Sequence, residues 1–91
     1  MSTSLRPKVT GHTPAKCFAS KYRRLLKTKG VVCIIVEAPK PKALSLKPPG
    51  AIKKVWKDQE EKTRNRDGDI IKHTITWHNW RQSQRYTIHY G

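Results

Sequence analysis

The chain has 91 residues, 20 of them Lys or Arg and only six Asp or Glu, and the net charge of +14 favours a polyanion as its partner. This length allows one small domain with tails and no more. The longest apolar run has six residues, far fewer than the roughly 20 of a membrane-spanning helix, and residues 1–16 lack the apolar core of a secretory signal, so an intracellular location is expected.

The charge is concentrated in the N-terminal half. Residues 1–54 carry +12 and residues 55–91 only +2, which makes the first half the expected contact surface. Residues 1–12 are rich in Ser, Thr, Lys and Pro and predict a flexible basic arm ahead of a folded unit over residues 13–91.

A basic helix is predicted over residues 14–29, with Thr13 as its N-cap and Pro14 in its first turn. Helical spacing gives it one apolar face, formed by Phe18, Tyr22, Leu25 and Leu26. Residues 31–37 follow as a continuous β-branched segment, which predicts a strand covered on both faces.

Residues 38–50 contain four prolines and three lysines and predict an extended connector that does not pair inside a sheet. Residues 51–64 fit one helical face, so a second helix is expected there, with a strand through residues 52–56 as the alternative. Asp67-Gly68 predicts a tight turn.

Residues 69–90 alternate with period two and predict an antiparallel hairpin whose strands are joined by about seven residues. Its apolar face carries Ile71, His73, Ile75, Trp77, Tyr86, Ile88 and Tyr90, and its polar face carries Lys72, Thr74, Thr76, Arg85, Thr87 and His89. The expected fold is a small single α+β domain in which the basic helix packs on a short antiparallel sheet.

Residues 77–85 combine two tryptophans, a histidine and two arginines, a mixture typical of single-stranded nucleic-acid recognition. Trp77 is expected in the core, whereas Trp80 fits both a base-stacking role and a cap on the sheet edge. Together with the basic half of the chain, this segment predicts a nucleic-acid interface. Its candidate contact residues are Lys16, Lys21, Arg23, Arg24, Lys27, Lys29, Lys40, Lys42, Trp80, Arg81 and Arg85.

Two other functions compete with nucleic-acid binding. A helix over residues 14–29 with one basic and one apolar side is also compatible with an anionic membrane surface. His73, His78 and His89, with cations nearby, include the parts of a metal-free ribonuclease. However, the predicted hairpin puts His73 and His89 on opposite faces, and no carboxylate is close in sequence to orient either one, so no catalytic residue is assigned.

Metal and cofactor sites are not expected. The four histidines and two cysteines show no Cys-x-x-Cys or His-x-x-x-His spacing. In a chain without an export signal, Cys17 and Cys33 are expected to be reduced thiols that serve as small core residues.

Two short resemblances accompany these patterns. Ile52-Lys53-Lys54-Val55-Trp56 is similar to a stretch of the small basic chromatin proteins of thermophilic archaea, whose compact barrel lacks the long N-terminal half seen here. The size, basicity and C-terminal hairpin resemble ribosome-dependent toxin ribonucleases, with a different order of elements. Neither resemblance covers the chain.

The residues therefore predict a binding protein, not an enzyme. RNA is preferred to DNA, because an extended connector and an aromatic loop suit irregular or single-stranded targets. A ribonucleoprotein particle, such as the ribosome, or a compact viral genome is the expected setting.

Overall fold

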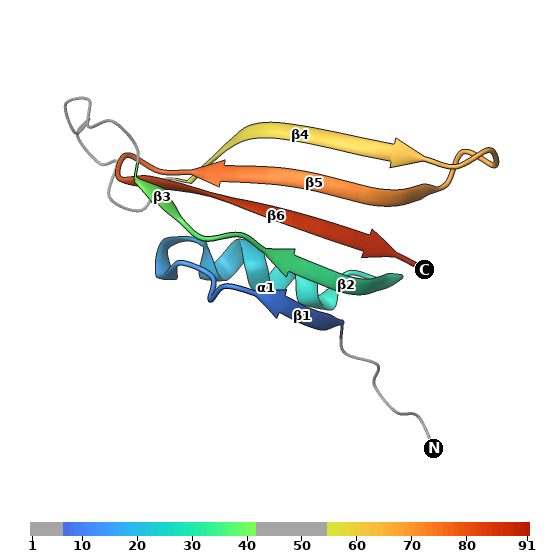
Figure 1. Cartoon of the computed structure of the whole chain (residues 1–91), viewed down its shortest axis with the longest axis horizontal. Coiled ribbons are helices and arrows are strands. Elements are labelled where there is room, and N and C mark those ends of the chain that lie inside the picture. Colours follow the sequence, from blue (N-terminus) through green and yellow to red (C-terminus); the bar gives the residue numbers. More distant parts are fainter. Residues whose placement is uncertain (1–6, 42–54) are drawn as a thin grey trace, which may run out of the picture.

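The computed structural model describes residues 7–41 and 55–91. Within them the elements are β1 (Lys8–Gly11), the 3-10 turn η1 (Lys16–Phe18), α1 (Ala19–Lys27), β2 (Val31–Val36), β3 (Lys40–Pro41), β4 (Trp56–Arg64), β5 (Ile70–His78) and β6 (Gln82–Tyr90). The strands form one sheet in the order β1-β2-β6-β5-β4, and β3 pairs with the start of β6 (Figure 1). Because β1 and β2 are parallel and all other pairs antiparallel, the sheet is mixed and the domain is α+β.

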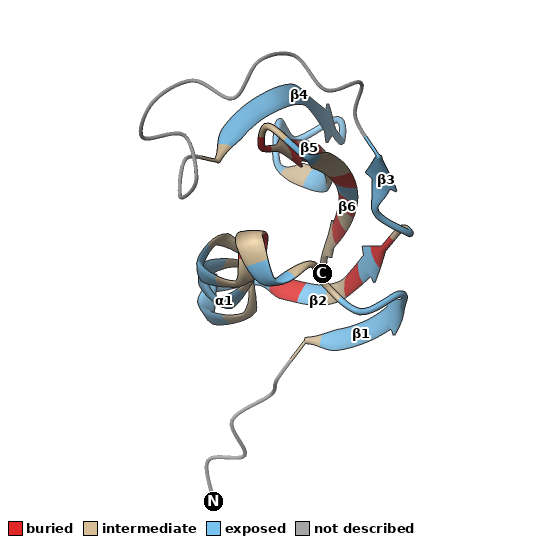
Figure 2. Cartoon of the chain, turned by 90° about the vertical axis from the view of Figure 1, so that its left-hand side faces the viewer, coloured by how far each residue is buried: buried red, intermediate tan, exposed pale blue. Residues whose placement is uncertain are grey.

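The sheet curves, and α1 lies on its concave side (Figure 2). The core is on this side and consists of Phe18, Val31, Ile34, Val36, Ile75, Trp77, Tyr86 and Ile88. Tyr22, Leu25 and Leu26 of α1 pack against this core but remain half-buried. The predicted apolar face of the helix therefore points toward the sheet as expected, although no residue of α1 itself is fully buried.

The helical segment is shorter than the predicted 14–29. Thr13 makes no cap; Ala15 is extended, with ψ at 143°, and precedes η1. The buried side chain of Gln84 explains the late start, since its oxygen accepts the Ala15 N–H at 2.9 Å and its amide donates to the Thr13 carbonyl at 3.2 Å. These bonds satisfy backbone groups that would otherwise belong to the first helical turn.

Part of the predicted flexible arm over residues 1–12 is a strand, and residues 1–6 lie outside the described residues. Lys8–Gly11 forms β1, which pairs with β2 in register from Lys8 opposite Cys33 to Gly11 opposite Val36. Gly11 has a φ of 97°, and a Cβ there would collide with the Val36 carbonyl, so this position needs glycine.

Strand β2 is predicted correctly in position but not in environment. Ile34 and Val36 are buried, whereas Val32 is 55% and Ile35 37% exposed. The strand is thus covered on the α1 side only, and the prediction of two covered faces is wrong.

The connector and the second predicted helix also differ from expectation. Lys40 and Pro41 do pair with a strand, opposite Ser83 and Gln82 of β6. Residues 42–54, which include Lys42 and most of the archaeal-like stretch, lie outside the described residues. From Trp56 to Arg64 the predicted helix is instead the strand β4, every residue of which is exposed. The apolar residues at helical spacing in this segment do not pack on a core, because neither side of β4 is buried. Pairing with β5 determines its structure instead.

The C-terminal hairpin and the Asp-Gly turn are confirmed. Gly68 has a φ of 86°, and the Asn65 side chain accepts the N–H groups of Asp67 and Asp69, each at 3.0 Å. The polar face is also as predicted, because Lys72, Thr74 and Thr76 lie opposite His89, Thr87 and Arg85. The loop is shorter than expected, with only residues 79–81 between the strands. No described helix is long and apolar enough to cross a membrane.

Candidate nucleic-acid interface

The turn between β5 and β6 is fixed by the side chain of Asn79. Its oxygen accepts the backbone N–H groups of Arg81 and Gln82, each at 2.8 Å. The backbone N–H of Asn79 donates to the Gln82 carbonyl at 2.9 Å. Asn79 is 4% exposed, so these bonds are shielded from water. The turn therefore presents Trp80 and Arg81 from a rigid base.

An open groove of about 580 Å³ lies beside this turn. It is lined by Lys16, Cys17, Pro39, Pro41, Asn79, Trp80, Arg81 and Gln82. Three segments distant in sequence meet here: the start of the helical segment, the strand β3 with its flank, and the β5–β6 turn. These lining residues include two cations and an indole and no carboxylate.

Inside the groove, several side chains are held in place. The guanidinium of Arg81 lies 5.6 Å from the centre of the Trp80 ring, a cation–π distance. The Gln82 amide donates to the Cys17 sulfur at 3.2 Å and so connects the turn to η1. The groove thus offers an aromatic surface, an amide and positive charge together.

Buried Gln84 positions the walls of the groove. Besides the bonds to the segment before Lys16, its amide donates to the Glu37 carbonyl at 2.7 Å, just before Pro39. The same side chain therefore links both flanking segments to β6. Gln84 is absent from the residues predicted from the sequence. Its position on the inward face of an alternating strand is the signal that marks it.

The structure brings together only part of the predicted contact set. Lys16, Trp80 and Arg81 line the groove, and Lys40 lies next to it in β3. Lys21 is half-buried on α1, Arg23 and Arg24 are exposed there, and Lys27 and Lys29 line a different pocket at the far end of the helix. Arg85 lies on the convex face, where its Nε is 3.7 Å from Glu37.

The two tryptophans of the hairpin have different environments. Trp77 is 5% exposed and its ring centre is 4.8 Å from that of Tyr86, which confirms its core assignment. Trp80 is half-buried and lines the groove.

The histidines do not form one site. His73 faces the α1 side and lies opposite Ile88, His89 is on the convex face opposite Lys72, and His78 stacks on Trp56 with ring centres 5.5 Å apart. This confirms that His73 and His89 are on opposite faces.

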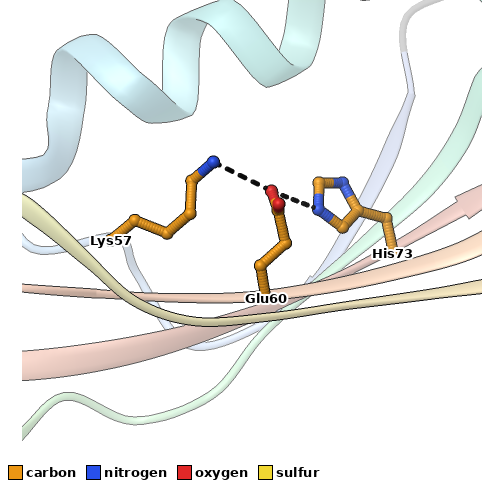
Figure 3. A network of polar contacts seen from close by, with 3 residues as sticks. All are labelled: Lys57, Glu60 and His73. Carbon is orange, nitrogen blue, oxygen red and sulfur yellow. Dashed lines mark hydrogen bonds and ion pairs between the residues drawn. The ribbon is translucent and has the colours of Figure 1, made fainter.

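A carboxylate does reach His73, contrary to expectation (Figure 3). Glu60 of β4 has one oxygen 2.9 Å from the His73 Nε2 and 3.0 Å from the Lys57 Nζ. The hydrogen bond from Lys57 is the main cause of the lowered pKa of Glu60, and His73 lowers it further. The contact was not visible in the sequence, because it depends on β4 being a strand.

The cysteines are free thiols, and both are half-buried, so neither is a fully buried core residue. Cys17 lines the groove, whereas Cys33 lies opposite His89 on β6. Within the described residues, no group of three His, Cys, Asp or Glu side chains is placed to hold a metal ion.

Comparison with protein families, with curated proteins and with solved structures gives no match to this chain.

Proposed function

We propose that this chain binds single-stranded RNA, with the groove between η1, β3 and the β5–β6 turn as the central contact. One observation carries the proposal: Lys16, Trp80 and Arg81 line one groove that has no lining carboxylate. In this arrangement a base stacks on the Trp80 indole, and the two cations bind the adjoining phosphates. Aromatic stacking combined with positive charge is the usual basis of single-stranded nucleic-acid binding.

The charge of the chain supports the same partner. With a net charge of +14, the protein attracts any polyanion, and the exposed Arg23 and Arg24 on α1 extend the positive surface beyond the groove. A half-buried tryptophan in a groove suits an unpaired base better than a duplex, whose bases are stacked on one another. RNA is therefore proposed ahead of DNA, within an intracellular ribonucleoprotein or a viral particle.

A ribonuclease is the second candidate, and one contact favours it. Glu60 and His73 are within hydrogen-bond distance, which supplies the carboxylate that a general acid–base pair needs. We nevertheless propose a binding protein, because Glu60 and His73 are bonded to each other and Lys57 occupies the same carboxylate oxygen. This leaves no phosphate-sized space between the two titratable groups.

The first experiment compares two pairs of cations. Lys16→Ala with Arg81→Ala removes two charges from the groove, and Lys27→Ala with Lys29→Ala removes two from the other end of α1. Binding to single-stranded RNA is measured for each pair over a salt series. The groove pair should reduce the slope of log K against log salt by about 1.4, corresponding to two lost phosphate contacts, and the control pair by clearly less. Equal effects would contradict the groove as the contact site.

A second experiment uses the two thiols as internal probes. Bound RNA should slow alkylation of Cys17, which lines the groove, and leave Cys33 unaffected. Mass spectrometry of the alkylated peptides gives both rates in one sample. Equal protection of the two cysteines, or none, would count against the proposal.

A further inference from the structure

Strand β4 is one of the two edge strands of the sheet, opposite β1, and all nine of its residues are exposed. Within the described residues it pairs only with β5, so its other edge presents backbone N–H and C=O groups without a partner strand. Such an edge is a template for another strand.

The charge of β4 differs from that of the rest of the chain. It contains three basic residues and three of the six acidic residues, and therefore has no net charge in a protein of +14. Two copies of this protein repel each other over most of their surface. At β4 that repulsion is smallest, which makes this edge the place where a second copy can approach.

The order of charges in β4 specifies one register. Residues 59–63 pair regularly with β5 between two bulges. If this segment pairs antiparallel with itself around Glu61, Glu60 lies opposite the partner's Lys62, and by symmetry the pair occurs twice. The same register brings Asp58 toward the partner's Arg64.

Neighbouring registers are less favourable. Centring the pair on Glu60 opposes two Glu60 carboxylates, and its attractive pair, Asp58 with Lys62, needs a residue at a bulge. Centring it on Lys62 opposes two lysines, and its attractive pair, Glu60 with Arg64, also needs a residue at a bulge. Only the register around Glu61 keeps an attractive pair, Glu60 with Lys62, inside the regular segment 59–63. In the register around Glu61, the two Glu61 carboxylates are the like charges that meet. Lys72 lines the same cavity as Glu61, on the same face of the sheet. Glu60 is already oriented by Lys57 and His73 (Figure 3), so its carboxylate is held in place before pairing.

We propose that β4 is a self-association surface. It pairs antiparallel with β4 of a second copy around Glu61 and continues the sheet across a two-fold axis. The proposal goes beyond RNA binding and does not depend on it. The groove lies at the β5–β6 turn, and no residue of β4 lines it.

The experiment measures mass by sedimentation equilibrium over a concentration series, on protein freed of nucleic acid. The wild type should reach twice its mass of 10.5 kDa. Lys62→Glu and Glu60→Lys, each alone, should weaken dimerisation about tenfold or more, because two attractive pairs become repulsive. The double variant Glu60→Lys with Lys62→Glu should restore it, since the exchanged charges again attract.

Two controls keep the test specific. Lys27→Glu makes the same change in net charge as Lys62→Glu but lies on α1, and it should not weaken the dimer. Circular dichroism and thermal unfolding report whether each variant folds. In the wild type, amide hydrogens of residues 59–63 should exchange more slowly than in Lys62→Glu. A wild type that stays monomeric, single variants that dimerise normally, or a charge exchange that fails to restore pairing would each overturn the proposal.

Discussion

The hydroxyl of Tyr86 donates a 2.9 Å hydrogen bond to the side-chain oxygen of Gln84, two residues earlier on the same face of β6. Both side chains are almost completely buried. Burial raises the pKa of Tyr86, so its hydroxyl remains protonated and available as a donor. The Gln84 amide makes four hydrogen bonds in all, and every one holds a segment next to the groove or the core beneath it.

Replacing Gln84 should therefore destabilise the protein strongly. Gln84→Leu leaves a buried hydroxyl, one N–H and two carbonyls without this partner, and an expected loss of about 2–4 kcal/mol follows from the cost of unsatisfied buried groups. Chemical denaturation measures the loss. Gln59→Leu, at an exposed position of β4, is the control and should change stability little. A stable Gln84→Leu variant would show that the network is dispensable.

The two hairpin tryptophans should separate binding from stability. Trp80→Ala should weaken binding to single-stranded RNA roughly five- to hundredfold, the value of one stacked base, with only a small change in melting temperature. Trp77→Ala should instead cost about 3–5 kcal/mol of stability, because Trp77 is in the core. Affinity and thermal unfolding are measured on both variants. The opposite pattern would exclude Trp80 as the stacking residue.

RNA affinity should depend steeply on salt. Several phosphate contacts release condensed counterions, so the binding constant should fall by orders of magnitude between about 50 and 200 mM salt. A titration monitored by fluorescence anisotropy at several salt concentrations is sufficient. A constant that hardly changes over this range would contradict an electrostatic interface.

The Lys57–Glu60–His73 cluster should make stability sensitive to acid. The pKa of Glu60 is lowered in the folded protein, so the unfolded chain binds this proton more tightly. The stabilisation is complete above the ordinary glutamate pKa and is lost as the pH falls through the lowered value. As the pH falls below the ordinary glutamate pKa, the wild type should progressively lose its advantage over Glu60→Gln. A difference in melting temperature that is independent of pH would refute this.

RNA cleavage should be absent. We expect no cleavage of free or ribosome-bound RNA above a control in which His73, His78 and His89 are all replaced by Ala. Gel analysis over a pH range provides the measurement, with Glu60→Gln as a second control. Reproducible cleavage that disappears in both controls would favour the ribonuclease candidate instead.

The elements that were predicted correctly are those that depend on residues close together in the sequence. The turn at Gly68, the β2 segment and the alternation of the hairpin all follow from backbone conformation and side-chain period, and each was predicted from the sequence. The faces of β5 and β6 were correct for the same reason, since a period of two assigns alternate residues to opposite sides.

The predictions were wrong where a contact with a residue distant in the sequence determines the structure. The helix begins late because Gln84, 69 residues away from Ala15, accepts its N–H. Residues 8–11 form a strand only because β2 offers them an edge, and Glu60 meets His73 only because β4 is extended. The same holds for the groove, since no sequence pattern places Lys16 beside Trp80.

The position of β6 has a consequence for how the protein folds. This strand is the last in sequence but lies in the middle of the sheet, where it pairs with β2, β3 and β5. Until it leaves the ribosome, β1–β2 and β4–β5 have no strand to join them, and Trp77 lacks the Tyr86 ring against which it packs. Contacts of such long sequence separation form slowly. A chain that ends before residue 82 would therefore lack the strand that joins the two parts of the sheet, and it is expected to remain unfolded.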